Sequence, residues 1–129
     1  MTEKVTYARL KWAGGTHRFC IDLSQPVSLY PIPDPFARLQ RLMMGQWSAQ
    51  DVYDTIRRGL ATGTFSGNAM GEAQALFDRF CHRRPIAELV PLAQTVLGVA
   101  IFGIDKSVAD LGLEPEEVDA RPDGDADVK

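Results

Sequence analysis

Residues 86–104 read IAELVPLAQTVLGVAIFGI, and this stretch decides the fold because it is apolar around most of its circumference. Its strongly polar residues are Glu88, Gln94 and Thr95. A helix of this kind lies at the centre of a domain or is shared with a partner. A membrane span is the alternative, but the polar residues and Pro91 leave only a short unbroken apolar run. We therefore expect a central helix, with Pro91 bending it or marking its true start.

The segment before this stretch predicts further helices, of which the first begins at Asp34-Pro35. Aspartate suits the capping position and proline the first helical position, and Gly45 is a natural end. Its apolar residues recur at helical spacing, which predicts that they share a buried face. They are Phe36, Leu39, Leu42 and Met43.

Two more helices follow, each with its own apolar stripe. Ser48 to Asp51 form a capping box, after which Val52, Ile56 and Leu60 fall on one face, with Arg57 and Arg58 toward water. The next helix begins at Ala69 or Met70 and ends at Pro85, after Arg83 and Arg84. Its predicted stripe is Ala73, Leu76, Phe77, Phe80 and Cys81.

The N-terminal part predicts a two-stranded hairpin, with strands at 5–12 and 18–23 around Gly14-Gly15. We expect the apolar side of the ribbon to face the helices. On that side we place Thr6, Ala8, Leu10, Trp12, Phe19 and Ile21. The connection at 24–35 is extended because it contains four prolines: Pro26, Pro31, Pro33 and Pro35.

The predicted fold class is therefore α+β, with a short hairpin packed on a bundle of about four helices. Residues 1–104 form one compact domain, made of the hairpin at 5–23, the connection at 24–35 and a helical body at 36–104. Residues 105–129 carry nine acidic and three basic residues. Because this segment has few large apolar residues, we expect a flexible acidic tail.

Composition bounds the class of protein. The 129 residues are 45% hydrophobic and 24% charged, which is ordinary for a globular domain. Two cysteines are too few for a disulfide framework and are expected as reduced thiols. The N-terminus has no pattern of a signal peptide, so we expect a cytoplasmic protein.

No reactive constellation emerges from the sequence. His17, Cys20, Cys81 and His82 could in principle bind zinc, but residues three apart on a strand or adjacent on a helix point in different directions. Asp51 and Asp54 are expected on a solvated helix face, and no serine lies in a nucleophile turn. We expect no catalytic, cofactor or metal site and no enzyme activity.

Arginines are frequent in the helical body, and short helices joined by tight turns leave a small DNA-binding regulator as an alternative. These arginines are Arg38, Arg41, Arg57, Arg58, Arg79, Arg83 and Arg84. The other interpretation places them on solvated faces and at helix ends, and the small positive excess of the body is a weak signal for nucleic acid.

Three segments carry a family resemblance: LQRLMMGQWSAQDV at 39–52, TIRRGL at 55–60 and RPIAELVPLAQ at 84–94. Together they resemble a bacterial gene transfer agent protein family that is similar to phage tail-assembly chaperones and is also labelled as tail tube proteins. The resemblance spans about residues 7–104. The prolines between 26 and 35 depart from the family pattern, in which a helix continues from the hairpin.

The resemblance implies a non-enzymatic protein-binding factor in the assembly of a phage-like tail. Its leading form is a chaperone that keeps the tape-measure protein soluble, and the alternative is a structural component of the tail tube or connector. The partners would be tape-measure or tail tube proteins, possibly with a homo-oligomer, and the protein could also associate with the virion. We expect the partner to contact large apolar residues at a turn, a loop and the outer side of the apolar helix. These are Trp47, Phe65, Val99 and Phe102.

Overall fold

The computed structural model describes residues 3–12, 14–21, 23, 34–63, 69–81 and 84–115. Residues 24–33 of the connection predicted at 24–35, Phe65 and residues 116–129 lie outside this range. In chain order the elements are β1 (Lys4–Val5), β2 (Tyr7–Trp12), β3 (Gly15–Cys20), α1 (Pro35–Met43), α2 (Ala49–Gly63), α3 (Ala69–Cys81), the 3-10 helix η1 (Ile86–Leu89), α4 (Val90–Phe102), β4 (Ile104–Asp105) and α5 (Lys106–Ala109). The predicted α+β class, a short hairpin with helices, is confirmed.

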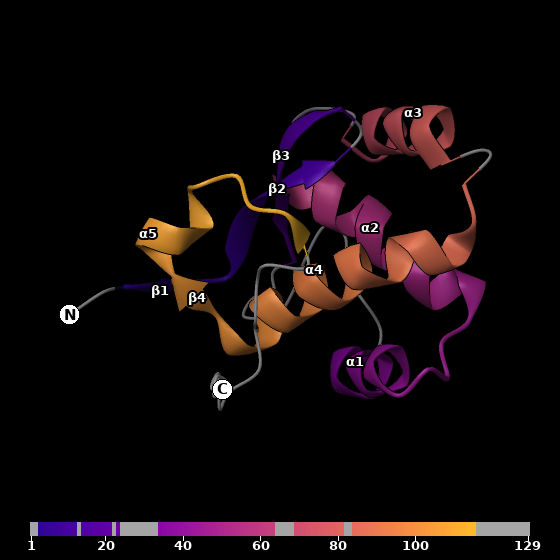
Figure 1. Cartoon of the computed structure of the whole chain (residues 1–129), viewed down its shortest axis with the longest axis horizontal. Coiled ribbons are helices and arrows are strands. Elements are labelled where there is room, and N and C mark those ends of the chain that lie inside the picture. The colour runs from indigo at the N-terminus through magenta and orange to yellow at the C-terminus, as the bar shows by residue number, and fades with distance from the viewer. Residues whose placement is uncertain are drawn as a thin grey trace.

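Helix α4 is the centre of the core, as its composition predicts. Six consecutive residues, Thr95 to Ala100, are buried, so this part of the helix has no solvent-facing side. Pro91 lies in the first turn and marks the start of the α-helix after the 3-10 turn of η1. Figure 1 shows α1 on one side of α4, with α2 and the hairpin on the other. Within the described residues, no helix is both long and apolar enough to span a membrane.

The hairpin covers one side of α2 and α4. β2 and β3 pair antiparallel from Tyr7 with Cys20 to Trp12 with Gly15, and Gly14 turns the chain with a φ of 77°. The inward residues Ala8, Leu10 and Phe19 are each 2% exposed or less, as predicted. Thr6 is an exception, because it is exposed and lies between β1 and β2.

Helix α2 packs closely on the hairpin at Gly59. A Cβ atom at Gly59 would lie 2.9 Å from Cγ1 of Val96 and 3.3 Å from Cδ2 of Phe19. The predicted stripe of Val52, Ile56 and Leu60 is completely buried. A glycine in the helix interior therefore allows α2 to approach both the sheet and α4.

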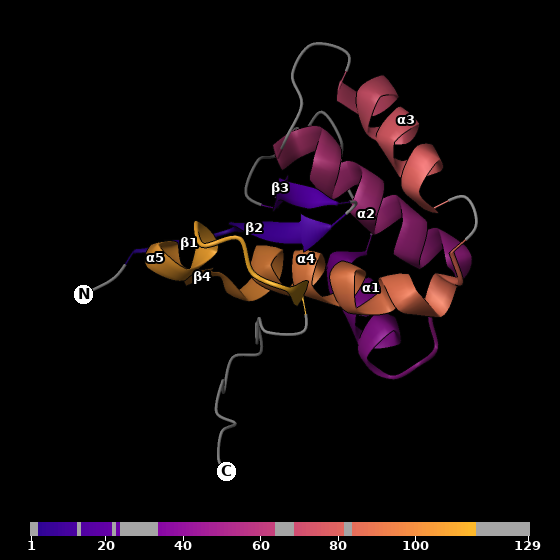
Figure 2. The same ribbon diagram turned by 45° about the horizontal axis from the view of Figure 1, so that its top comes forward.

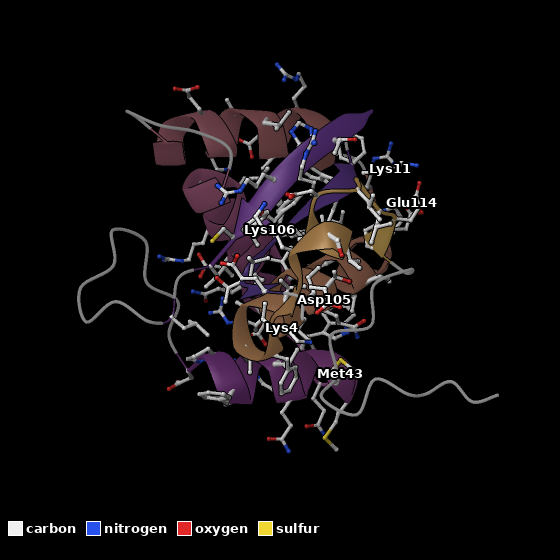
Figure 3. All side chains as sticks on the ribbon, turned by 90° about the vertical axis from the view of Figure 1, so that its left-hand side faces the viewer. Lys4, Lys11, Met43, Asp105, Lys106 and Glu114 are labelled. Atoms are coloured by element: carbon white, nitrogen blue, oxygen red, sulfur yellow. The ribbon has the colours of Figure 1, made fainter. Side chains whose placement is uncertain are left out.

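Residues 105–115 belong to the folded body, so the domain boundary predicted after Ile104 is wrong. β4 pairs antiparallel with β1, and Lys4 Nζ lies 3.7 Å from Asp105 Oδ1 (Figure 3). Leu113 then lies parallel to β2, where its backbone donates to Arg9 O and accepts from Lys11 N, both at 2.9 Å. Figure 2 shows this segment running from α5 along β2 toward α4. Backbone hydrogen bonds, which an acidic composition does not reveal, hold the segment in place.

Candidate functional site

Helix α1 is rotated with respect to its predicted orientation, so that part of its predicted inner face is exposed. The Arg38 side chain faces inward and is 3% exposed, whereas Phe36 and Met43 are 70% and 48% exposed. Leu42, 1% exposed, and the half-buried Leu39 lie inward as predicted. The prediction for Phe36 and Met43 is wrong, because the orientation of the helix is decided by ion pairs.

The ion pairs of α1 connect it to the start of α2. Arg38 Nη1 donates to Asp54 Oδ2 at 3.1 Å and to Thr55 Oγ1 at 3.3 Å, and Arg38 Nε lies 3.5 Å from Asp51 Oδ1. Arg41 makes a bidentate contact with Asp51, at 2.8 Å from Nε and 2.7 Å from Nη2. Because Arg38 is buried, moving it away from these carboxylates would leave its own charge buried without a partner, so the side chain is held firmly.

Asp54 also binds two arginines of its own helix. Arg58 Nε donates to Asp54 Oδ2 at 2.7 Å, and Arg57 Nη2 lies 3.6 Å from Oδ1. Asp51 and Asp54 are only 4% and 5% exposed, so the prediction of a solvated acidic face is wrong. Since Arg38, Arg41, Arg57 and Arg58 bind these carboxylates, the DNA-binding alternative loses much of its charged surface.

The capping box at the start of α2 is confirmed and completes the cluster. Ser48 Oγ accepts from Asp51 N, and Asp51 Oδ2 accepts from Ser48 N, both at 3.1 Å. The hydrogen bonds from Arg41, with that from Ser48 N, lower the pKa of Asp51 to about 2. The corresponding prediction for α1 is wrong, because Asp34 has a φ of 48° and its side chain makes no capping hydrogen bond.

The outward side of α1 is apolar and carries no charged side chain. Phe36, Gln40, Met43 and Met44 are all exposed and follow one another at spacings of i, i+4, i+7 and i+8. We call these four residues the α1 outer face. Gln40 Nε2 lies 3.8 Å from Met44 Sδ, within the face itself. Figure 3 shows α1 along the lower edge of the molecule, with Met43 near one end of the helix.

The far side of α1 rests on the core and on α4. Gln94, one of the few polar residues of α4, donates from Nε2 to Leu42 O at 2.8 Å. Leu42 itself is almost fully buried. Ion pairs with α2 and packing against α4 therefore fix helix α1, and the α1 outer face is exposed to solvent.

The described partner-binding residues that were predicted from the sequence differ widely in exposure. Val99 is 1% exposed, so its predicted place on the outer side of α4 is wrong. Phe102, at the end of α4, is 40% exposed, and Trp47 is half-buried beyond α1. Phe65 lies outside the described residues. The outward face of α1 was missed because apolar periodicity assigned two of its residues, Phe36 and Met43, to the core. The sequence signal that could have indicated the rotation of α1 is its pair of arginines, which is followed by two aspartates on α2.

The residues considered for metal binding can be compared with the structure only where they are described. There, no three histidine, cysteine, aspartate or glutamate side chains are arranged to hold a metal ion. His17 lies beside Trp12, and its burial lowers the pKa of the imidazole. The charged residues between α1 and α2 bind one another.

Comparison with known proteins identifies the family. No curated protein and no solved structure matches the chain. The model of the family described as "Phage tail tube protein, GTA-gp10" matches residues 6–103, which include the hairpin and helices α1 to α4. The chain therefore belongs to this family of tail proteins related to phages and gene transfer agents.

Proposed function

We propose that the protein is a non-enzymatic assembly factor of a phage-like tail, acting as a chaperone for the tape-measure protein. Membership of the tail protein family supports the setting. The observation that carries the proposal is the α1 outer face, where Phe36 and Met44 are 70% and 61% exposed while Arg38 of the same helix is buried. Such a face suits binding to another polypeptide.

The residue types of this face support a chaperone in particular. Methionine side chains are flexible and polarisable, and they adapt to different apolar partners. Met43 and Met44 are adjacent at the end of α1, and Gln40 is the polar residue between them and Phe36. A surface of this kind can hold an apolar segment without requiring one exact shape.

The family description favours a second candidate function, a structural component of the tail tube or connector. A tube subunit must contact copies of itself in the finished particle. A chaperone instead acts in the cytoplasm of the producing cell and leaves before the particle is complete. The two functions therefore differ in where the protein is found after assembly.

Quantitative mass spectrometry of purified particles separates these functions. A chaperone should be absent or present in traces, whereas a tube subunit should be present in many copies. The complementary measurement is a pull-down of the tagged full-length chain from producing cells. Capture of the tape-measure protein, identified by its peptides, supports the chaperone, and recovery of nucleic acid alone contradicts it.

A further inference from the structure

We propose that the α1 outer face binds a single amphipathic helix of a partner protein, with acidic residues flanking the apolar stripe of that helix. This inference specifies the partner of the proposed function. It rests on that function because it assumes that the protein acts by binding another protein. It commits to a helix rather than to an extended strand or a second copy of the chain. Three observations carry it: the spacing of the face, its area and the charge beside it.

The spacing of the face matches a helical partner. Phe36, Gln40, Met43 and Met44 form one line along α1, at the intervals by which helices pack on each other. The line from Phe36 to Met44 is about 12 Å long at 1.5 Å per residue. A second helix laid along it would meet Phe36 near one end and both methionines near the other. Helix recognition of this type uses anchors at the same spacing.

The area of the face argues against a symmetric dimer. At 70%, 48% and 61% exposure, Phe36, Met43 and Met44 present on the order of 350 Å² together. A stable dimer buries about 800 Å² on each partner, more than twice this area. An exposed area of this size is large enough to bind one short helix. The ion pairs of Arg38 prevent α1 from turning to hide the stripe within its own fold.

The charge beside the stripe selects the partner. Residues 35–50 contain two arginines and no acidic residue, and Asp34 precedes the helix. Arg38 is buried, and Arg41 is bound by Asp51 through Nε and Nη2. The Arg41 side chain nevertheless remains 38% exposed at the flank of the stripe, where its guanidinium can meet an acidic group of a partner. A partner helix with glutamates beside its apolar stripe would meet this positive flank, whereas lysines there would be repelled.

The test uses three synthetic helical peptides and the full-length protein. The first peptide has a leucine stripe flanked by glutamates, the second has the same stripe flanked by lysines, and the third has the stripe replaced by serines. Binding is followed by fluorescence anisotropy at two salt concentrations. We expect the glutamate peptide to bind, the lysine peptide to bind at least tenfold more weakly and the serine peptide not to bind. Added salt should weaken the binding of the glutamate peptide.

The variants assign the binding to the α1 outer face. Phe36→Ser combined with Met43→Ser should reduce the affinity for the glutamate peptide at least tenfold. Leu111→Ser is the matched control, because Leu111 is 67% exposed beyond α5 and lies outside this face. It should leave the affinity unchanged. Because the replaced side chains are exposed, each variant should fold. Circular dichroism and thermal melting check this.

Three results would overturn the proposal. They are equal binding of the lysine and glutamate peptides, binding that survives the double substitution, and a concentration-dependent dimer that this substitution abolishes. The last would assign the face to a second copy of the chain. If the double variant still captures the tape-measure protein, the docking site is wrong and the chaperone function stands. If the peptide binds at the face while no tail protein is captured, the function is wrong and the site stands.

Discussion

Replacing Asp51 by asparagine tests whether the ion pairs between α1 and α2 stabilise the fold. The substitution removes the charge that Arg41 binds through two hydrogen bonds of 2.8 and 2.7 Å. After the substitution, the buried Arg38 still pairs with the carboxylate of Asp54 but no longer with a charged group at position 51. The asparagine can still accept the capping hydrogen bond from Ser48 N, so the start of α2 should be kept.

The magnitude follows from the pKa of Asp51. Its pKa is lowered to about 2 in the folded protein. Against about 3.9 in an unfolded chain, and at about 1.36 kcal/mol per unit of pKa, the ionised form contributes roughly 2.5 kcal/mol. Because the folded pKa is the lower one, this contribution is complete above about pH 4 and is lost as the pH falls toward 2. Asp51→Asn should therefore cost about 2.5 kcal/mol at pH 7 and progressively less below pH 4.

Urea unfolding at pH 7, 5, 4 and 3 measures this dependence for the natural chain and the variant. The difference in the free energy of unfolding should be constant from pH 7 to 5 and should narrow at pH 3. Asp78→Asn is the control, since Asp78 is an exposed residue of α3 that accepts a hydrogen bond from Gln74. It should change the free energy by less than about 0.5 kcal/mol. A difference for Asp51→Asn that is equally small, or that does not narrow at low pH, would refute the reasoning.

Other predictions concern packing, capping and the C-terminal segment. Gly59→Ala should destabilise by about 1–3 kcal/mol in urea unfolding, because the new Cβ would meet Val96 at 2.9 Å; a neutral or stabilising effect would contradict the close approach. Ser48→Ala should cost about 1 kcal/mol through loss of the capping hydrogen bond, and an unchanged unfolding midpoint would argue against that bond. A chain ending after Ile104 should melt at a lower temperature than one ending after Pro115, since residues 105–115 pair with β1 and β2. Equal melting temperatures would show that this pairing adds no stability.

The helices that bury a plain apolar stripe were predictable from the sequence. Val52, Ile56 and Leu60 recur every four residues and have no competing ionic contact, so their periodicity alone identifies the buried face of α2. The central place of α4 follows in the same way from its composition. Where burial of apolar residues alone orients a helix, the pattern of those residues is sufficient to predict its buried face.

Helix α1 and the C-terminal segment were not predictable in this way. Arg38 turns α1 because Asp54, 16 residues away, lies opposite it in the folded chain. Periodicity within one helix contains no information on such a pair. Leu113 is held by backbone hydrogen bonds to β2, which depend on no side-chain pattern. The candidate site was missed for the first of these reasons, since Phe36 and Met43 are apolar and were assigned to the interior.

Oxidation of the exposed methionines at the end of α1 should report whether a partner covers them. Met43 and Met44 present their thioethers to solvent, where peroxide converts them to sulfoxides. The added oxygen makes the side chain polar, so oxidised protein should lose its affinity for apolar ligands at this helix. A bound polypeptide would shield the sulfur atoms, and the rate at which they gain oxygen would then record occupancy inside a living cell.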